Sequence, residues 1–127
     1  MAVTLSGSVS IVEQGLRIGS VDFTIVGENM FRSSRSVAAS TTNELVTCEV
    51  DYTDLLLVYI HGDQDFTLKT EDSTTPEQTF TFVANEPILW TDSSPVSCPF
   101  TTSFDNMYVT TGAIPASLNL TIILLSQ

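Results

Sequence analysis

Apolar and polar residues alternate along most of this chain with the period of two that is typical of β-strands. Near the start, Val3, Leu5, Val9 and Ile11 occupy odd positions, and serine or threonine fills most of the even positions. Side chains of a strand point alternately to its two faces, so this spacing places the apolar residues on one face. The same pattern predicts strands around residues 21–25, 46–50, 66–68, 80–82, 107–109 and 118–124.

One segment departs from this alternation. Residues 55–60 are continuously apolar, which predicts a strand covered on both faces. Residues 61–65 are typical of a turn, and Phe66 and Leu68 after it are expected to form a short hairpin partner of the 55–60 strand. Residues 88–90 predict another strand after the turn at Asn85–Pro87.

Three stretches lack either pattern and are expected to be irregular. The longest is residues 92–102, which contain Pro95 and Pro99. Residues 28–40 are expected to be irregular, and residues 33–42, rich in Ser and Ala, to form a loop because Ser and Thr are weak helix formers. Residues 71–78 are polar and contain Pro76.

Eight or nine short strands with turns at even spacing predict an all-β protein. We expect an antiparallel β-sandwich of about eight strands, jelly-roll-like or immunoglobulin-like. A length of 127 residues fits one domain spanning residues 1–127. The residues expected in its core include Phe23, Leu57, Phe66, Phe80, Phe82 and Leu120.

The chain is strongly acidic, with 15 acidic residues against 4 basic ones and a formal net charge of −11. The cations are Arg17, Arg32, Arg35 and Lys69. A nucleic-acid partner needs clustered Lys or Arg, and an anionic membrane repels this charge, so neither is expected. No secretory signal is visible at the start of the chain, and reduced thiols are expected at Cys48, a small core residue, and at Cys98.

Catalytic and metal-binding motifs are not recognisable. His61 is the single histidine, and no Gly-x-Ser-x-Gly elbow accompanies it, so we expect a surface residue and no enzyme activity. Asp63 and Asp65 with Glu71 and Asp72 across a hairpin could supply oxygen ligands to calcium, but a solvated acidic turn is favoured. No cofactor or metal is expected.

The aromatic residues offer a binding alternative. Trp90, Tyr52, Tyr59 and Tyr108 could form a platform on which a sugar stacks. A lone tryptophan within Pro87–Thr91 is more often packed at the edge of a sandwich. A carbohydrate- or receptor-binding module is therefore the second functional hypothesis.

The order of four segments resembles small virion proteins of tailed bacteriophages. They are residues 54–61, 64–68, 84–90 and 116–125, and the resemblance covers about residues 45–127, with Asn85 where Gly is usual. It implies a β-sandwich subunit of the virion, a capsid cement or decoration protein that binds the major capsid protein, or else a tail or neck component. By analogy, a homo-oligomer, a dimer or trimer, is expected.

Two irregular segments are the candidate contact surfaces of such a subunit. Residues 92–102 and 28–40 combine apolar side chains with two of the four cations. The candidate interface residues are Met30, Phe31, Arg32, Arg35, Val96, Pro99 and Phe100. The alternative is that both segments simply cap one end of the sandwich.

Overall fold

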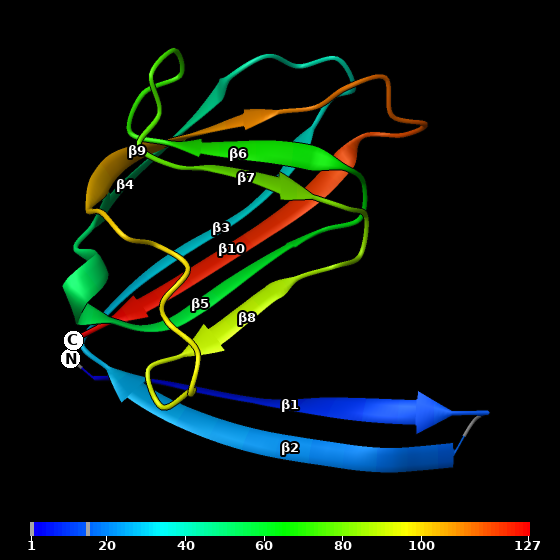
Figure 1. Ribbon diagram of the computed structural model, residues 1–127, viewed down its shortest axis with the longest axis vertical. Coiled ribbons are helices and arrows are strands. Elements are labelled where there is room, and N and C mark those ends of the chain that lie inside the picture. Colours follow the sequence, from blue (N-terminus) through cyan, green and yellow to red (C-terminus); the bar gives the residue numbers. More distant parts are fainter. Residues whose placement is uncertain (1, 15) are drawn as a thin grey trace.

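The computed structural model describes residues 2–14 and 16–127, and within these it gives no side-chain description for residues 10–13 and 16–21. The described chain forms ten strands and one 3-10 helix (Figure 1). They are β1 (Val3–Glu13), β2 (Leu16–Gly27), β3 (Asn29–Val37), β4 (Glu44–Val50), η1 (Tyr52–Asp54), β5 (Leu55–Gly62), β6 (Phe66–Thr70), β7 (Thr79–Phe82), β8 (Ile88–Thr91), β9 (Phe104–Thr110) and β10 (Leu118–Ser126).

Strands β3 to β10 pair in a nested order. β3 pairs with β10, β4 with β9, β5 with β8 and β6 with β7, as if one long hairpin had been folded over. Two more pairings complete a first sheet, β3-β10-β5-β8, and a second sheet, β4-β9-β6-β7, and every pairing is antiparallel. Eight strands nested in this way across two sheets make a jelly roll. The predicted antiparallel sandwich is confirmed, and its strand order is the jelly-roll version.

The core lies between the two sheets and takes side chains from both. Phe66, Phe82 and Leu120 are buried there as predicted, and Phe80 packs against the core while remaining half-buried. Leu57 is buried but lies outside this core cluster, on the outer face of the first sheet. The prediction for Phe23 was wrong, because this residue lies on the β1–β2 hairpin and not in the sandwich.

The continuously apolar β5 is covered on both faces, as predicted. Val58 and Ile60 point into the core, whereas Leu57 points to the outer face of the first sheet and is 3% exposed. The end of β10 follows the same rule, with Leu124 in the core and Leu125 buried on the outer face. The cover on the outer face is the β1–β2 hairpin, which packs there as a partial third layer.

The hairpin pairs with no other strand of the described chain. Its register joins Leu5 to Ile25 and Gly7 to Phe23, so these apolar residues share one face. Figure 1 shows the hairpin along one side of the jelly roll, starting near the end of β10. Gly27 fits closely there, since a β-carbon on it would lie 2.5 Å from the carbonyl oxygen of Ser126.

The expectation of a loop over residues 33–42 and an irregular segment over 28–40 was wrong for residues 29–37, which form β3. This edge strand pairs with β10 along its whole length. Its exposed side chains, Met30, Arg32, Ser34 and Ser36, alternate with more buried ones, and the backbone of β3 gains hydrogen bonds from β10 although its serines give no apolar signal. Sheet context therefore outweighs local preference here.

The expected hairpin between residues 55–60 and Phe66–Leu68 was also wrong. β6 belongs to the second sheet and pairs with β7 and β9, whereas β5 stays in the first sheet with β10 and β8. Residues 63–65 therefore carry the chain from one sheet to the other. A short turn is compatible with either path, so local sequence could not distinguish them.

Asn85 adopts a left-handed backbone conformation in the turn after β7. Its φ is +63°, in the left-handed region that glycine and asparagine adopt most readily. The Asn85 backbone N–H donates to the carbonyl of Gly62 over 2.8 Å, which holds the turn after β7 against the end of β5. Asparagine thus supplies the positive φ that this turn adopts.

Candidate interaction surface

The loop between β8 and β9 closes one open side of the sandwich, where β7 and β8 are the edge strands. Phe100 is 1% exposed and packs edge-on against Phe80, with ring centroids 5.5 Å apart, and against Phe104 at 4.8 Å. Gln78 fixes the loop by donating to the Pro99 carbonyl over 3.0 Å and accepting from the Thr101 N–H over 2.8 Å. The loop is therefore part of the fold as well as of the surface.

The three candidate interface residues of this loop separate into two roles. Phe100 fills the core, so its side chain is not exposed to a partner. Pro99 is half-buried, and its carbonyl is bonded to Gln78. Val96 is 64% exposed at the loop surface, and its carbonyl accepts from Trp90 Nε1 over 3.0 Å, which holds the loop to β8.

The four candidates on β3 divide according to the face on which they lie. Met30 and Arg32 point outward, and Met30 is 40% exposed. Phe31 and Arg35 are half-buried on the inward side, and Phe31 packs against the core. The side chain of Arg32 has no hydrogen bond or ion pair with the described part of the chain. Met30 and Arg32 are therefore the two candidate residues of β3 with exposed side chains.

Arg35 instead joins the edges of the two sheets. Its Nη1 lies 3.3 Å from Glu44 Oε2 on β4 and donates to the Leu45 carbonyl over 3.2 Å. Its Nε donates to the hydroxyl of Ser33 over 3.2 Å. Arg35 therefore links β3 to β4 at the open side of the jelly roll, and 33% of its side chain remains exposed. Of the other cations, the side chain of Arg17 lies outside the described residues.

Most of the exposed large apolar side chains in the described chain lie on the hairpin or on elements beside it. Val9 and Val26 lie on the hairpin, Met30 on β3, Leu89 on β8 and Val96 on the loop held to β8. Single exposed apolar residues are ordinary, and Met30 on β3 and Val96 after β8 lie at opposite edges of the first sheet, so they are separate exposed positions. We call Met30, Arg32 and Val96 the docking set.

Two of the carboxylates considered as calcium ligands, Asp63 and Asp72, instead accept hydrogen bonds from backbone N–H groups of the chain. Asp63 accepts from the backbone N–H and from the side-chain Nδ2 of Asn119, both at 2.7 Å, and these bonds lower the pKa of its carboxyl. Backbone N–H groups of Thr75 and Thr74 lower the pKa of Asp72 in the same way. The acidic character of the chain is thus partly structural, because ionised carboxylates satisfy loop N–H groups.

The candidate catalytic and calcium residues do not assemble into a site. His61 is half-buried and stacks on Tyr59, with ring centroids 6.3 Å apart, and no hydrogen bond joins it to a serine within the described chain. Asp63 and Asp65 lie before β6, whereas Glu71 and Asp72 lie after it. No group of three or more His, Cys, Asp or Glu among the residues described here is arranged to hold a metal ion.

The four aromatic residues of the proposed sugar platform lie on different surfaces. Trp90 packs against the core beside Val58, whereas Tyr59 points to the outer face of the first sheet. Tyr108 belongs to β9 in the second sheet, and Tyr52 to η1. No shared stacking platform results from these positions.

The two cysteines are free thiols in different surroundings. Cys48 is buried in the core as predicted, and burial, together with the charges of Asp105 and Glu71, raises its pKa to about 12. Cys98 is half-buried in the β8–β9 loop, and its pKa is also raised by burial. Neither environment favours a nucleophilic thiolate.

Comparisons with protein-family models, with curated proteins and with solved structures find no match to this chain. No helix among the described residues is long and apolar enough to cross a membrane. The function is therefore inferred from the fold and from the surface residues described above.

Proposed function

We propose that this chain is a structural virion protein of a tailed bacteriophage, a capsid cement or decoration protein that stabilises the shell by binding the major capsid protein. The role is non-enzymatic, and the site of action is the virion after assembly in the host cytoplasm. The observation that carries the proposal is the nested eight-stranded jelly roll, an architecture that recurs in viral capsid domains. This support is an analogy between folds, and the exposed residues described above supply a testable contact with the capsid protein.

The docking set gives the proposal two contact points, Met30 with Arg32 on β3 and Val96 after β8, at opposite edges of the first sheet. Met30 and Val96 are 40% and 64% exposed, and Arg32 lies two residues after Met30 on the same face of β3 with its guanidinium unpaired in the described chain. Apolar anchors and an arginine are the residue types that contribute most to binding in protein interfaces. A matching capsid surface presents an apolar hollow with an acidic group at its rim.

The remaining surface suits a protein that must stay dispersed before it assembles. A net charge of −11 favours solubility and discourages packaging with nucleic acid. Because Arg35 is engaged with Glu44, Arg32 is the candidate cation left on β3 for a partner. Binding to the capsid then uses these few exposed apolar and cationic side chains of an otherwise acidic molecule.

Co-sedimentation with capsids that lack this protein tests the proposal. The wild type is expected to pellet with capsids at a saturable ratio, and Arg32→Glu to weaken this binding about tenfold, which corresponds to ~1.4 kcal/mol. Lys69→Glu on the second sheet is the charge control, because it changes net charge equally and lies away from the docking set; since it also removes the bond from Lys69 Nζ to the Ser73 carbonyl, its fold is checked by circular dichroism. Val96→Asp and Val83→Asp form a second matched pair.

A carbohydrate- or receptor-binding module is the second candidate, since lectin domains also use the jelly roll. Binding to a glycan array together with failure to pellet with capsids would favour this second function and reject the first. Equal loss of capsid binding in the Arg32→Glu and Lys69→Glu variants would reject the docking set, even if capsid binding itself is observed.

A further inference from the structure

The β1–β2 hairpin is attached to the jelly roll by a very short connection. β2 ends at Gly27 and β3 begins at Asn29, which leaves Glu28 alone between two strands of different sheets. The Glu28 N–H donates to the Ser126 carbonyl over 2.9 Å, and Gly27 packs directly against β10. The chain therefore reverses through a single residue, Glu28, so that the hairpin lies on the first sheet of the same chain.

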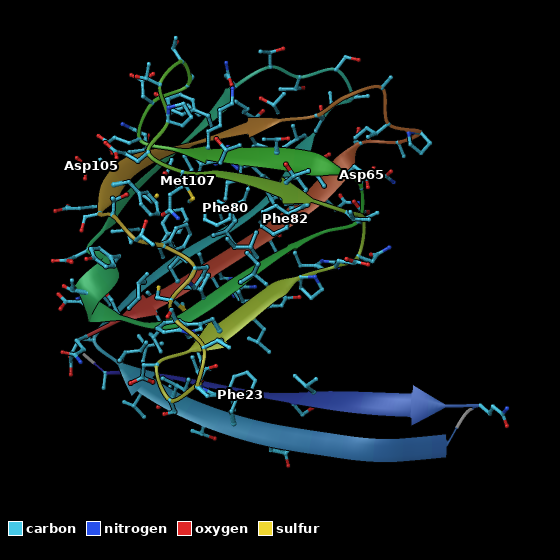
Figure 2. All side chains as sticks on the ribbon, in the orientation of Figure 1. Phe23, Asp65, Phe80, Phe82, Asp105 and Met107 are labelled. Carbon is cyan, nitrogen blue, oxygen red and sulfur yellow. The ribbon has the colours of Figure 1, made fainter. Side chains whose placement is uncertain are left out.

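The seam between hairpin and sheet is made of uncharged side chains. Leu5 and Phe23 on the hairpin face Leu57, Leu89 and Ile123 on the first sheet, and the side chains described around the hollow between them include no acid or base. Figure 2 shows Phe23 pointing from β2 toward the jelly roll. In a chain with 15 acids and 4 bases, such a surface is one through which two copies can meet without repulsion between carboxylates.

The seam is not well filled within one chain. A solvent-open hollow of about 210 Å³ remains between hairpin and sheet, and Leu89 on its wall is 37% exposed. Several side chains of the sandwich core, by contrast, are fully buried. A two-stranded hairpin is at best marginally stable alone, so it depends on a sheet surface, its own or another, to hold it.

We propose that the hairpin is an exchangeable arm, and that two copies of this chain form a dimer in which each hairpin covers the first sheet of the other. Both complementary surfaces are present on every copy, so exchange needs no new contact, only a different path at Glu28. Short connections of this kind favour exchange, because the closed form requires a tight return that the exchanged form avoids. The proposal concerns the free protein and goes beyond the binding of capsids.

Disulfide trapping tests the exchange between two variants, each with one introduced cysteine besides the buried Cys48. In a Cys98→Ser background, Leu5→Cys places a thiol on the hairpin side of the seam and Leu89→Cys places one on the sheet side. The two variants are unfolded together, refolded and oxidised. Exchange predicts a disulfide-linked pair containing one chain of each variant. Val83→Cys, exposed on the segment after β7 and outside the seam, replaces Leu89→Cys as the control and is expected to give at least tenfold less linked product.

The mass of the free protein completes the test. Sedimentation equilibrium is expected to give twice the 13.8 kDa of one chain, and inserting four Gly/Ser residues between Gly27 and Glu28 is expected to return the protein to one chain while its circular dichroism stays unchanged. A monomeric wild type would overturn the proposal. A dimer that links Leu5→Cys to Val83→Cys as readily as to Leu89→Cys would also overturn it, because that dimer would use another surface.

Discussion

A β-carbon at Gly62 would lie 2.5 Å from Cε1 of Phe66, so the end of β5 and the start of β6 fit together only because position 62 has no side chain. The same β-carbon would lie 2.7 Å from Cδ1 of Leu118 at the start of β10. Gly62 thus marks the place where the chain leaves the first sheet and enters the second. The Phe66 ring beside it stacks on Phe82 with centroids 4.4 Å apart, which joins β6 to β7 at the start of the second sheet.

Gly62→Ala is therefore expected to destabilise the fold by about 1–3 kcal/mol, the usual effect of overpacking a filled core. Both neighbours are buried, so neither can move aside freely. Urea denaturation measures the change. Gly112→Ala is the matched control, because a β-carbon there would meet nothing within 4 Å, and it is expected to change the free energy of unfolding by less than about 0.5 kcal/mol.

Phe100→Ala is expected to lower the free energy of unfolding by about 3–5 kcal/mol, because it removes a buried ring from the loop that closes the β7–β8 side. Val96→Ala in the same loop is expected to change stability by less than about 0.5 kcal/mol, since Val96 is exposed. Equal effects of the two substitutions, measured by chemical denaturation, would show that the loop does not contribute Phe100 to the core.

Acid is expected to destabilise the protein through Asp63. The hydrogen bonds from Asn119 lower the folded-state pKa of Asp63 below 3.8, so the ionised form is the one that the fold stabilises. This contribution is present above the unfolded-state pKa and is lost as the pH falls through the folded-state pKa. Melting temperatures recorded from pH 7 to pH 2 are expected to fall less steeply below pH 4 for Asp63→Asn than for the wild type.

Asp92→Asn provides the control for this pH experiment, because Asp92 is exposed and its carboxylate has no hydrogen bond in the described chain. Its acid dependence is expected to match that of the wild type. An Asp63→Asn profile with the wild-type slope would mean that the bonds to Asn119 do not favour the ionised carboxylate. Asn119→Ala removes the side-chain bond alone and is expected to give an intermediate slope.

Thiol labelling is expected to distinguish the two cysteines. With a pKa of about 12 and a position in the core, Cys48 should not react with an aromatic disulfide reagent at pH 8 until the protein unfolds. Cys98 is only half-buried and should react first. One thiol titrated in native protein and two in urea is the expected result, and Cys98→Ser should abolish the native signal. Rapid labelling of both thiols would contradict the buried position of Cys48.

Local patterns predicted where strands lie better than which strands pair. Alternation is a property of neighbouring residues, so most strands, including β1 and β10, were visible in the sequence. Pairing depends on the path of the chain, and the turn at residues 63–65 looks the same whether the next strand returns to its own sheet or crosses to the other. The strand β3 was missed because its serines carry no apolar signal, although β10 supplies its hydrogen bonds.

The sequence also predicted only some of the exposed residues of the candidate surface. Exposed Met30, Arg32 and Val96 remain candidates, whereas Phe100 and Arg35 proved to serve the fold. Sequence cannot tell an apolar residue that faces solvent from one that closes a core when both lie in a loop with prolines. The apolar run of β5 did indicate cover on both faces, but only the structure identified the hairpin as that cover.

The most direct test of the structural virion role is a cryo-electron microscopy reconstruction of particles produced with this chain present and with it deleted. The proposal predicts jelly-roll density on the outer shell at every symmetry-equivalent position, with the docking set toward the capsid protein, and loss of that density in the deletion particles. Particles that are identical with and without the chain would contradict the proposal.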